Sequence, residues 1–207
     1  SKTLTHIGRS EKMLFMKKLL AILILIFTLP TLSQADDIRD FQIEGMSVGD
    51  SLLDYFSKSE IKKNTVRYDE SSSDRTYTTV EIYPNETSFN LNLYDGLVLI
   101  YKTKDNKFNL DSVSGSIFYK NNIEECYTAM DGVISDISEL FADINPTKIK
   151  TSNLKLGKWT DSKLIFKSGD FVIVRCVDYH KEKYIDHLRI SIHKKKYMDW
   201  IKAKAYK

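Results

Sequence analysis

The stretch NIEECYTAMDGVISDISELFADI, residues 122–144, decides the fold that this sequence predicts. Its apolar residues recur every three or four positions and fall on one arc of a helix, while acidic and hydroxyl residues occupy the rest. Asn122 with Glu125 forms a capping pair at the start, and Asn145-Pro146 is expected to end the helix, because the residue before proline avoids helical geometry. The pattern therefore predicts a helix of about six turns that turns one face toward a core.

Segments on both sides of this helix alternate between apolar and polar residues, as strands do. A type I′ hairpin turn is expected at Asp95-Gly96, and short helices are expected to begin at Ser47 and to cover 194–204. The predicted strands are 77–83, 88–94, 97–103, 114–120, 163–167, 171–178 and 184–193. This order predicts an α+β domain: an antiparallel β-sheet packed against one long amphipathic helix, with short helices near both ends of residues 36–207.

The N-terminal part reads as an export signal. Lys17 and Lys18 precede the apolar run LLAILILIFTL, and small residues precede a cleavage site expected after Ala35. This run is shorter than the roughly 20 residues that a membrane-spanning helix needs. We therefore expect 1–15 to be an upstream extension that is not native, 16–35 to be a signal peptide, and 36–207 to be a single α+β domain that is periplasmic or secreted.

Charge argues against a nucleic-acid partner. The chain of 207 residues has 31 Lys and Arg against 28 Asp and Glu, a net charge of +3. Five of those basic residues and one acidic residue precede Asp36, which leaves 26 basic and 27 acidic residues in the expected exported chain. A near-neutral domain with few arginines lacks the basic surface that nucleic acid requires.

Two cysteines, Cys126 and Cys176, are the only ones in the sequence. An even count in an exported chain favours a disulfide. Cys126 lies on the apolar arc of the predicted helix, and Cys176 alternates with Val172 and Val174 on its predicted strand, so both are expected to face the layer between helix and sheet. The alternative is two separate reduced thiols in the core.

No motif for catalysis, phosphate binding or metal binding occurs, so we expect no catalytic residue, no metal and no cofactor. The C-terminal part instead combines histidines with a basic run. In the last predicted strand, polar residues alternate with Leu188, Ile190 and Ile192 and share the opposite face. The candidate binding residues are His187, Arg189, His193, Lys194, Lys195 and Lys196.

These residues suggest three kinds of partner: another envelope protein, a small ligand, or an anionic membrane surface that the basic C-terminal segment touches. The alternative function is a hydrolase or metal-dependent enzyme that uses the region from Asp178 to His193. Its metal-binding groups would be Asp178, His180, Asp186, His187 and His193. His187 and His193 lie about 20 Å apart on an extended strand, too far to share one ion.

The stretch ADDIRDFQIEGMSVGDSLLDYF, residues 35–56, resembles the opening of an uncharacterised family of small exported proteins of marine alphaproteobacteria, and the resemblance continues through residues 123–144. It implies export and no known activity. Residues 44–47 are also similar to the start of small outer-membrane assembly lipoproteins, which implies an accessory role in assembly as a further alternative. The leading expectation is an exported, soluble, non-enzymatic binding or interaction domain of the bacterial envelope.

Mass spectrometry of the exported protein tests the predicted signal. We expect the intact mass to correspond to a chain that begins at Asp36, because signal peptidase cleaves after small residues such as Ala35. A chain that retains the apolar run of residues 19–29 would contradict the prediction.

Overall fold

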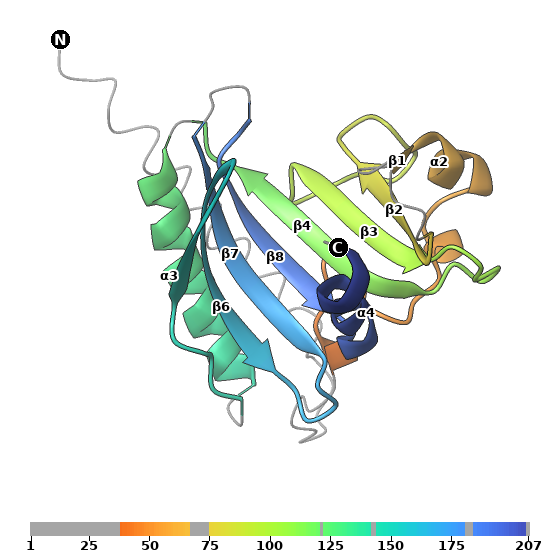
Figure 1. Cartoon of the computed structure of the whole chain (residues 1–207). Helices are drawn as coiled ribbons and strands as arrows, with labels where there is room; N and C mark the ends of the chain where they lie inside the picture. The colour runs from red at the N-terminus through yellow and green to blue at the C-terminus, as the bar shows by residue number, and fades with distance from the viewer. Residues whose placement is uncertain (1–37, 67–74, 121, 142–143, 181–183, 206–207) are drawn as a thin grey trace, which may run out of the picture. The chain divides into compact units, whose positions relative to one another are not determined.

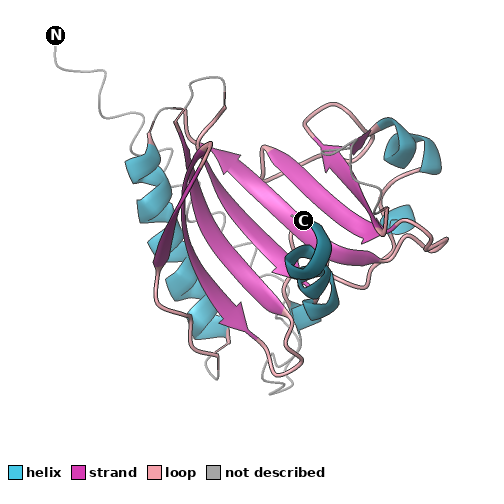
Figure 2. Ribbon diagram, viewed as in Figure 1, coloured by secondary structure: helices cyan, strands magenta, loops and turns pink. Residues whose placement is uncertain are grey.

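The computed structural model describes residues 38–66, 75–120, 122–141, 144–180 and 184–205, all of which belong to one compact unit, Ala35–Lys207. Its main feature is an eight-stranded antiparallel sheet with the strand order β1-β2-β3-β4-β8-β7-β6-β5 (Figures 1 and 2). The sheet and its helices make a mixed α+β fold, as the sequence predicts. The strands are β1 (Thr65–Val66), β2 (Tyr77–Ile82), β3 (Gly96–Lys102), β4 (Leu110–Phe118), β5 (Lys150–Leu154), β6 (Gly157–Ile165), β7 (Phe171–Tyr179) and β8 (His187–His193).

Helical segments precede, separate and follow the two runs of four strands. They are the 3-10 turns η2 (Ile38–Asp40) and η3 (Leu52–Asp54), the α-helices α2 (Lys58–Lys63), α3 (Ile123–Leu140) and α4 (Lys195–Trp200), and the π-helical turn η4 (Ile201–Ala205). None of the helices in the described ranges combines the length and the apolar character that a membrane span requires.

The sheet consists of two antiparallel meanders, β1–β4 and β5–β8, joined where β4 pairs with β8. In this pairing Ser114 lies opposite Ser191, and Ser116 lies opposite Arg189. Side chains alternate along each strand, so Leu188, Ile190 and Ile192 share one face of the sheet, which we call the core face. The residues between them lie on the opposite face, which we call the polar face.

The core face carries the hydrophobic core. Leu188, Ile190 and Ile192 on β8 are at most 2% exposed. They belong to one cluster with side chains from α3 and from the irregular segment 38–61. In Figure 1, α3 runs beside β6 and β7, and α4 lies on the other side of the sheet.

A disulfide between Cys126 on α3 and Cys176 on β7 ties the helix to the sheet. Both residues are fully buried. The predicted bridge is therefore confirmed, and its presence is compatible with an exported protein.

The predicted helix at Ser47 is wrong. The Ser47 N–H does donate to the Asp50 carboxylate at 2.8 Å, as a capped helix would require. Gly49, however, has φ +99°, and the chain continues as a turn in which the Gly49 N–H bonds to the Leu110 carbonyl. Pairing with β4 replaces the helix, and the first α-helix in the described ranges is α2.

The predicted strand at 88–94 and the hairpin turn at Asp95-Gly96 are also wrong. Residues 83–95 form a long connection between β2 and β3, and Gly96 already belongs to β3. The Glu44 carboxylate accepts the N–H groups of Asn92, Leu93 and Tyr94 at 2.7–3.2 Å, so a side chain takes the place of a partner strand.

Several boundaries differ from the prediction as well: β4 covers 110–118 rather than 114–120, β6 begins at Gly157 rather than at residue 163, and β8 begins at His187 rather than at residue 184. α3 ends at Leu140 rather than at Asn145-Pro146, and the Phe141 N–H closes its last turn on Ile137. β5 was not predicted, because its sequence KTSNL has no apolar alternation. It pairs on one side only, with β6, and four of its five residues are exposed.

The disulfide gives a prediction for stability. It closes a loop with a sequence separation of 50 residues, which the chain-entropy treatment values at about 4 kcal/mol. Reduction should therefore lower the midpoint of thermal unfolding by about 10 °C, measured by circular dichroism with and without phosphine reductant. The double variant Cys126→Ala/Cys176→Ala should unfold at the lower midpoint in both buffers. Equal midpoints for oxidised and reduced wild type would refute the prediction.

Candidate functional site

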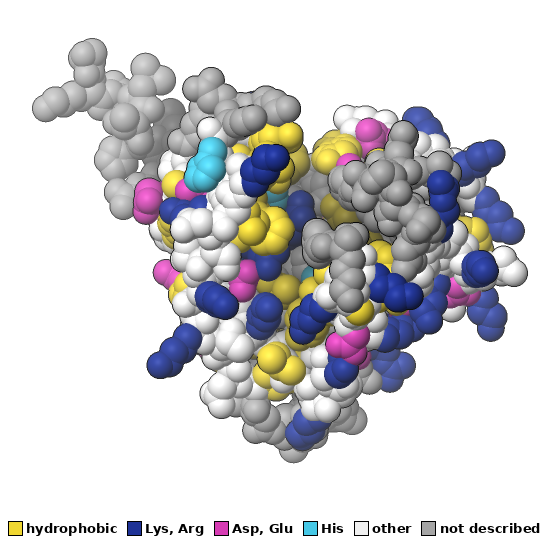
Figure 3. All heavy atoms as spheres, viewed as in Figure 1, with side chains coloured by type: hydrophobic (Ala, Val, Ile, Leu, Met, Phe, Trp, Pro, Cys, Tyr) yellow, Lys and Arg dark blue, Asp and Glu magenta, His cyan; other side chains and the backbone are white. Residues whose placement is uncertain are grey.

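The polar face is the candidate site, because its central strands carry polar groups that the fold does not use. Figure 3 looks onto this face and shows that it is hollowed, with hydrophobic and basic side chains inside. In the register of the sheet, Gly96, Ser116, Arg189, Arg175 and Asp161 form one row across five strands, β3 to β6. A sheet face in this position commonly packs against a second layer.

The floor of the hollow is built from small polar residues. Ser114, Ser116 and Ser191, which we call the serine floor, are only 4–5% exposed as residues. Their hydroxyls form no hydrogen bond with any other described residue, and none of the three is sealed from solvent. Small side chains at the centre of a sheet leave room above them, and free hydroxyls can donate to or accept from whatever fills that room.

Arg189 lies beside the serine floor, directly opposite Ser116. It is half-buried, and it makes no hydrogen bond or ion pair with any residue of the described ranges. Its Nε is fully buried and unsatisfied. Burial lowers the pKa of this guanidinium, and the charge of Arg175 lowers it further. A half-buried cation that no described carboxylate contacts costs free energy in the folded state.

Arg175, directly opposite on β7, has the reverse arrangement. Its Nε and Nη2 donate to Asp161 Oδ2 at 3.0 and 2.6 Å. Its guanidinium also lies 4.4 Å from the centre of the Trp159 ring, a cation–π contact. Of these two facing arginines, only Arg189 is therefore left for a ligand.

His187 carries a second buried atom that has no hydrogen-bond partner among the described residues. It is 4% exposed, and its Nδ1 lies 2.9 Å from the Ile185 carbonyl, which makes Nδ1 the protonated nitrogen. Its Nε2 is buried without a partner. Burial, and then the nearby charge of Arg189, lower the pKa of His187 to about 4, so the ring is neutral at pH 7 and Nε2 can accept a hydrogen bond.

His193 is a structural residue in the same strand. Its Nδ1 lies 2.8 Å from the Ser112 hydroxyl, and its ring packs against Phe171 and Tyr197. Burial and the arginine charges lower its pKa to about 3. A serine beside a neutral imidazole is the pairing that nucleophilic catalysis uses, but Ser112 is 0% exposed and no substrate reaches it.

An acidic and aromatic wall faces Arg189 from β2. Glu81 lies on the polar face, and its carboxylate accepts from the Tyr83 hydroxyl at 3.3 Å. Burial raises the pKa of Glu81, and the charge of Arg189 opposes that rise, so the two side chains interact through space without forming an ion pair. Between their strands lie β3 and β4, which leaves a floor about 14 Å wide between strand axes.

The three candidate lysines at the start of α4 are partnered within the molecule. Lys194 and Lys196 contact the same Asp111 oxygen at 3.5 and 2.9 Å, and Asp111 is 3% exposed on its side chain. Lys195 pairs with Asp199 one turn along the helix. These ion pairs fasten α4 to β4, so the basic run is in large part neutralised where it meets the sheet.

The residues of the alternative metal site do not converge. No group of three or more His, Cys, Asp or Glu in the described part of the chain has a geometry that could hold a metal ion. Asp178 pairs with Lys158 at 3.3 Å, and Asp186 accepts the Tyr179 N–H at 2.8 Å. His180 is exposed at the end of β7.

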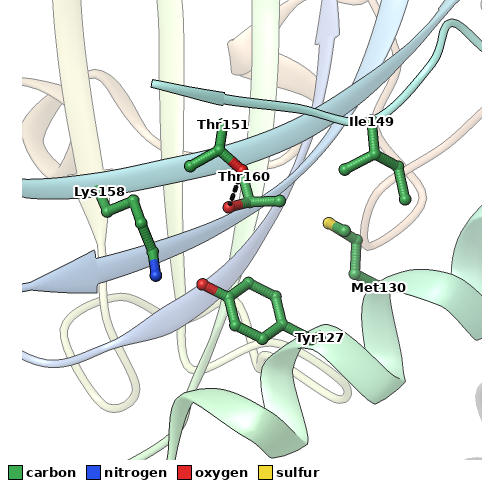
Figure 4. A pocket seen from close by; sticks show the side chains of 6 residues that line it. All are labelled: Tyr127, Met130, Ile149, Thr151, Lys158 and Thr160. Atoms are coloured by element: carbon green, nitrogen blue, oxygen red, sulfur yellow. Dashed lines mark hydrogen bonds between the residues drawn. The ribbon is translucent and has the colours of Figure 1, made fainter. Parts of the chain in front are cut away.

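A pocket of about 350 Å³ lies on the core-face side, between α3 and the strands β5 and β6. Figure 4 shows that its polar groups are already paired: the Thr151 and Thr160 hydroxyls bond to each other at 3.1 Å. Lys158 pairs with Asp178 and lies 5.8 Å from the centre of the Tyr127 ring. This pocket therefore offers a ligand fewer free groups than the polar face does.

His187, Arg189 and His193 share one strand face, as the sequence predicts. Arg175, Glu81 and the serine floor were not among the predicted site residues. The alternation of serine in LDSVSGSIF, residues 110–118, is the feature that could have revealed the floor. It gains meaning only once β4 is known to pair with β8.

Fold and site together define an α+β domain with a polar hollow on one face of its sheet. Comparison with known proteins gives no match: no family model, no curated protein and no solved structure is significantly similar to this chain.

The unpaired guanidinium gives a stability prediction. Arg189→Met should raise the free energy of unfolding by about 1–2 kcal/mol, because it removes an uncompensated buried charge and keeps the apolar stem. Arg175→Met, the matched control opposite it, should lower that free energy by about 2 kcal/mol, because it leaves the Asp161 carboxylate without its ion-pair partner. Urea unfolding at pH 7 measures both. A loss of stability in Arg189→Met as large as in Arg175→Met would show that Arg189 is structural.

Proposed function

We propose that this protein is a non-enzymatic binding domain of the bacterial envelope that holds an organic anion at Arg189 on the polar face of its sheet. The observation that carries the proposal is an unpaired, half-buried guanidinium beside hydroxyls that the fold leaves free. Guanidinium groups bind carboxylates and phosphates with two parallel hydrogen bonds.

Two unsatisfied buried atoms support a ligand at this position. Buried polar groups in folded proteins are nearly always satisfied, and each exception calls for an explanation, of which a missing bound ion or a functional role is one. Arg189 Nε and His187 Nε2 are two such exceptions, two residues apart on one strand. An anion at Arg189 would supply the missing counter-charge.

The basic C-terminal run is the weaker binding surface. Its lysines Lys194 and Lys196 share the buried Asp111, and Lys195 pairs with Asp199. A membrane or an acidic partner would have to compete with these contacts. We therefore propose the sheet, rather than the basic end, as the binding surface.

The rest of the molecule serves as scaffold in this proposal. α3 acts as the single long amphipathic helix that closes the core face, and the disulfide fixes it to β7. Export to an oxidising compartment, the expected signal peptide, and membership of the alphaproteobacterial family that residues 35–56 resemble are parts of the same proposal.

Titration with simple anions tests the proposed site. Purified protein at low ionic strength should bind acetate and inorganic phosphate at millimolar concentration, with amide NMR shifts concentrated in β4 and β8. Arg189→Gln should weaken binding at least tenfold, because it removes the cation that lies beside the serine floor and has no partner among the described residues.

Lys163→Gln is the matched control: it removes one positive charge from the same face, on β6. Its binding should stay within twofold of wild type. Equal affinity of wild type and Arg189→Gln for both anions would sink the proposal.

A further inference from the structure

Resting on the proposed function, the geometry points to an acidic sugar as the ligand: we propose that the hollow binds a hexuronate, with its carboxylate at Arg189 and its ring hydroxyls over the serine floor and toward Glu81.

The first support is the balance of free groups. A small carboxylate or phosphate needs donors only, and Arg189 with one or two serine hydroxyls would satisfy it. The hollow also holds an unused acceptor: the Glu81 carboxylate accepts only the Tyr83 hydroxyl, through Oε2, which leaves Oε1 free among the described residues. Acceptors beside an anion site require a ligand that donates as well. Sugar hydroxyls donate and accept, and a uronate joins them to a carboxylate.

The second support is the spacing of the two ends. Arg189 and Glu81 project over a floor two strands wide, and they interact electrostatically without touching. Free anions of acetate size reach one end only. A hexuronate carries its carboxylate on one side of the ring and hydroxyls on the other. With its carboxylate at Arg189, its hydroxyls therefore point toward Glu81.

The third support is the aromatic lining. Tyr83 is 39% exposed above β3, and its ring fills the space over Gly96, where a Cβ would lie 2.9 Å from the ring. Tyr179 lies half-buried on β7, with its ring centre 5.9 Å from that of His187 on the neighbouring strand. Flat apolar rings beside hydrogen-bonding groups match the C–H faces and hydroxyl rims of sugars.

A fatty acid is the main rival occupant, because Val98 and Ile173 also face the hollow. Its hydrocarbon chain would lie across Ser114 and Ser191 and would bury their hydroxyls without partners. Burying hydroxyls unpaired costs free energy. The serine floor therefore favours a hydroxylated ligand over an alkyl chain.

Isothermal titration calorimetry with five probes tests the inference: glucuronate, galacturonate, glucose, acetate and decanoate. At least one uronate should bind at least tenfold more tightly than acetate and than glucose, since a tenfold gain needs only about two net hydrogen bonds. Glu81→Gln should reduce uronate affinity at least threefold and leave acetate affinity within twofold, because acetate at Arg189 does not reach β2. Retained acetate binding shows that this variant is folded.

Each other outcome overturns the inference. If acetate binds as tightly as both uronates and Arg189→Gln abolishes that binding, the proposed anion site stands but the ligand is not a sugar. Tighter binding of decanoate would assign the hollow to an alkyl chain. If glucose binds as tightly as the uronates and Arg189→Gln leaves its affinity unchanged, the ligand does not bind Arg189 through a carboxylate. Absence of binding by all five probes would overturn both the inference and the proposed function.

Discussion

The pairing of β4 with β8 is the interaction on which the rest of the structure depends. It joins residues as far apart in sequence as Ser112 and His193, and it turns two separate meanders into one sheet. Each meander alone would expose an unpaired edge and half of the core face. The same pairing sets Ser116 beside Arg189 and Ser114 beside Ser191, so the seam that completes the core also assembles the hollow.

The core face of the sheet stabilises the fold, and the polar face carries the proposed binding site. The core face holds a continuous apolar cluster and the disulfide, and both favour the folded state. On the polar face, Arg189 and His187 keep unsatisfied buried atoms that oppose folding. A stable core is what allows this cost, because net stability is a small difference between large opposing terms. Arg175, opposite Arg189 on the neighbouring strand, is a structural arginine: Asp161 and Trp159 satisfy its guanidinium.

Local patterns predicted most elements correctly where neighbours in sequence decide the outcome. β2, β7 and α3 follow from period-two and period-3.6 spacing. The failures share one cause. At Ser47, distant contacts with β4 replaced a helix that had a local cap, and at 88–94 the Glu44 carboxylate took the backbone donors of a would-be strand.

For the site, the sequence by itself determined which β8 residues share a face, because side-chain direction in a strand alternates regardless of context. It also determined that Cys126 and Cys176 both face the core, which made the disulfide predictable. Only the tertiary structure decided that β8 lies between β4 and β7, and hence that Arg175 pairs with Asp161 while Arg189 has no hydrogen-bond or ion-pair partner among the described residues. Partner choice across strands depends on contacts between residues far apart in the chain, and no local pattern contains that information.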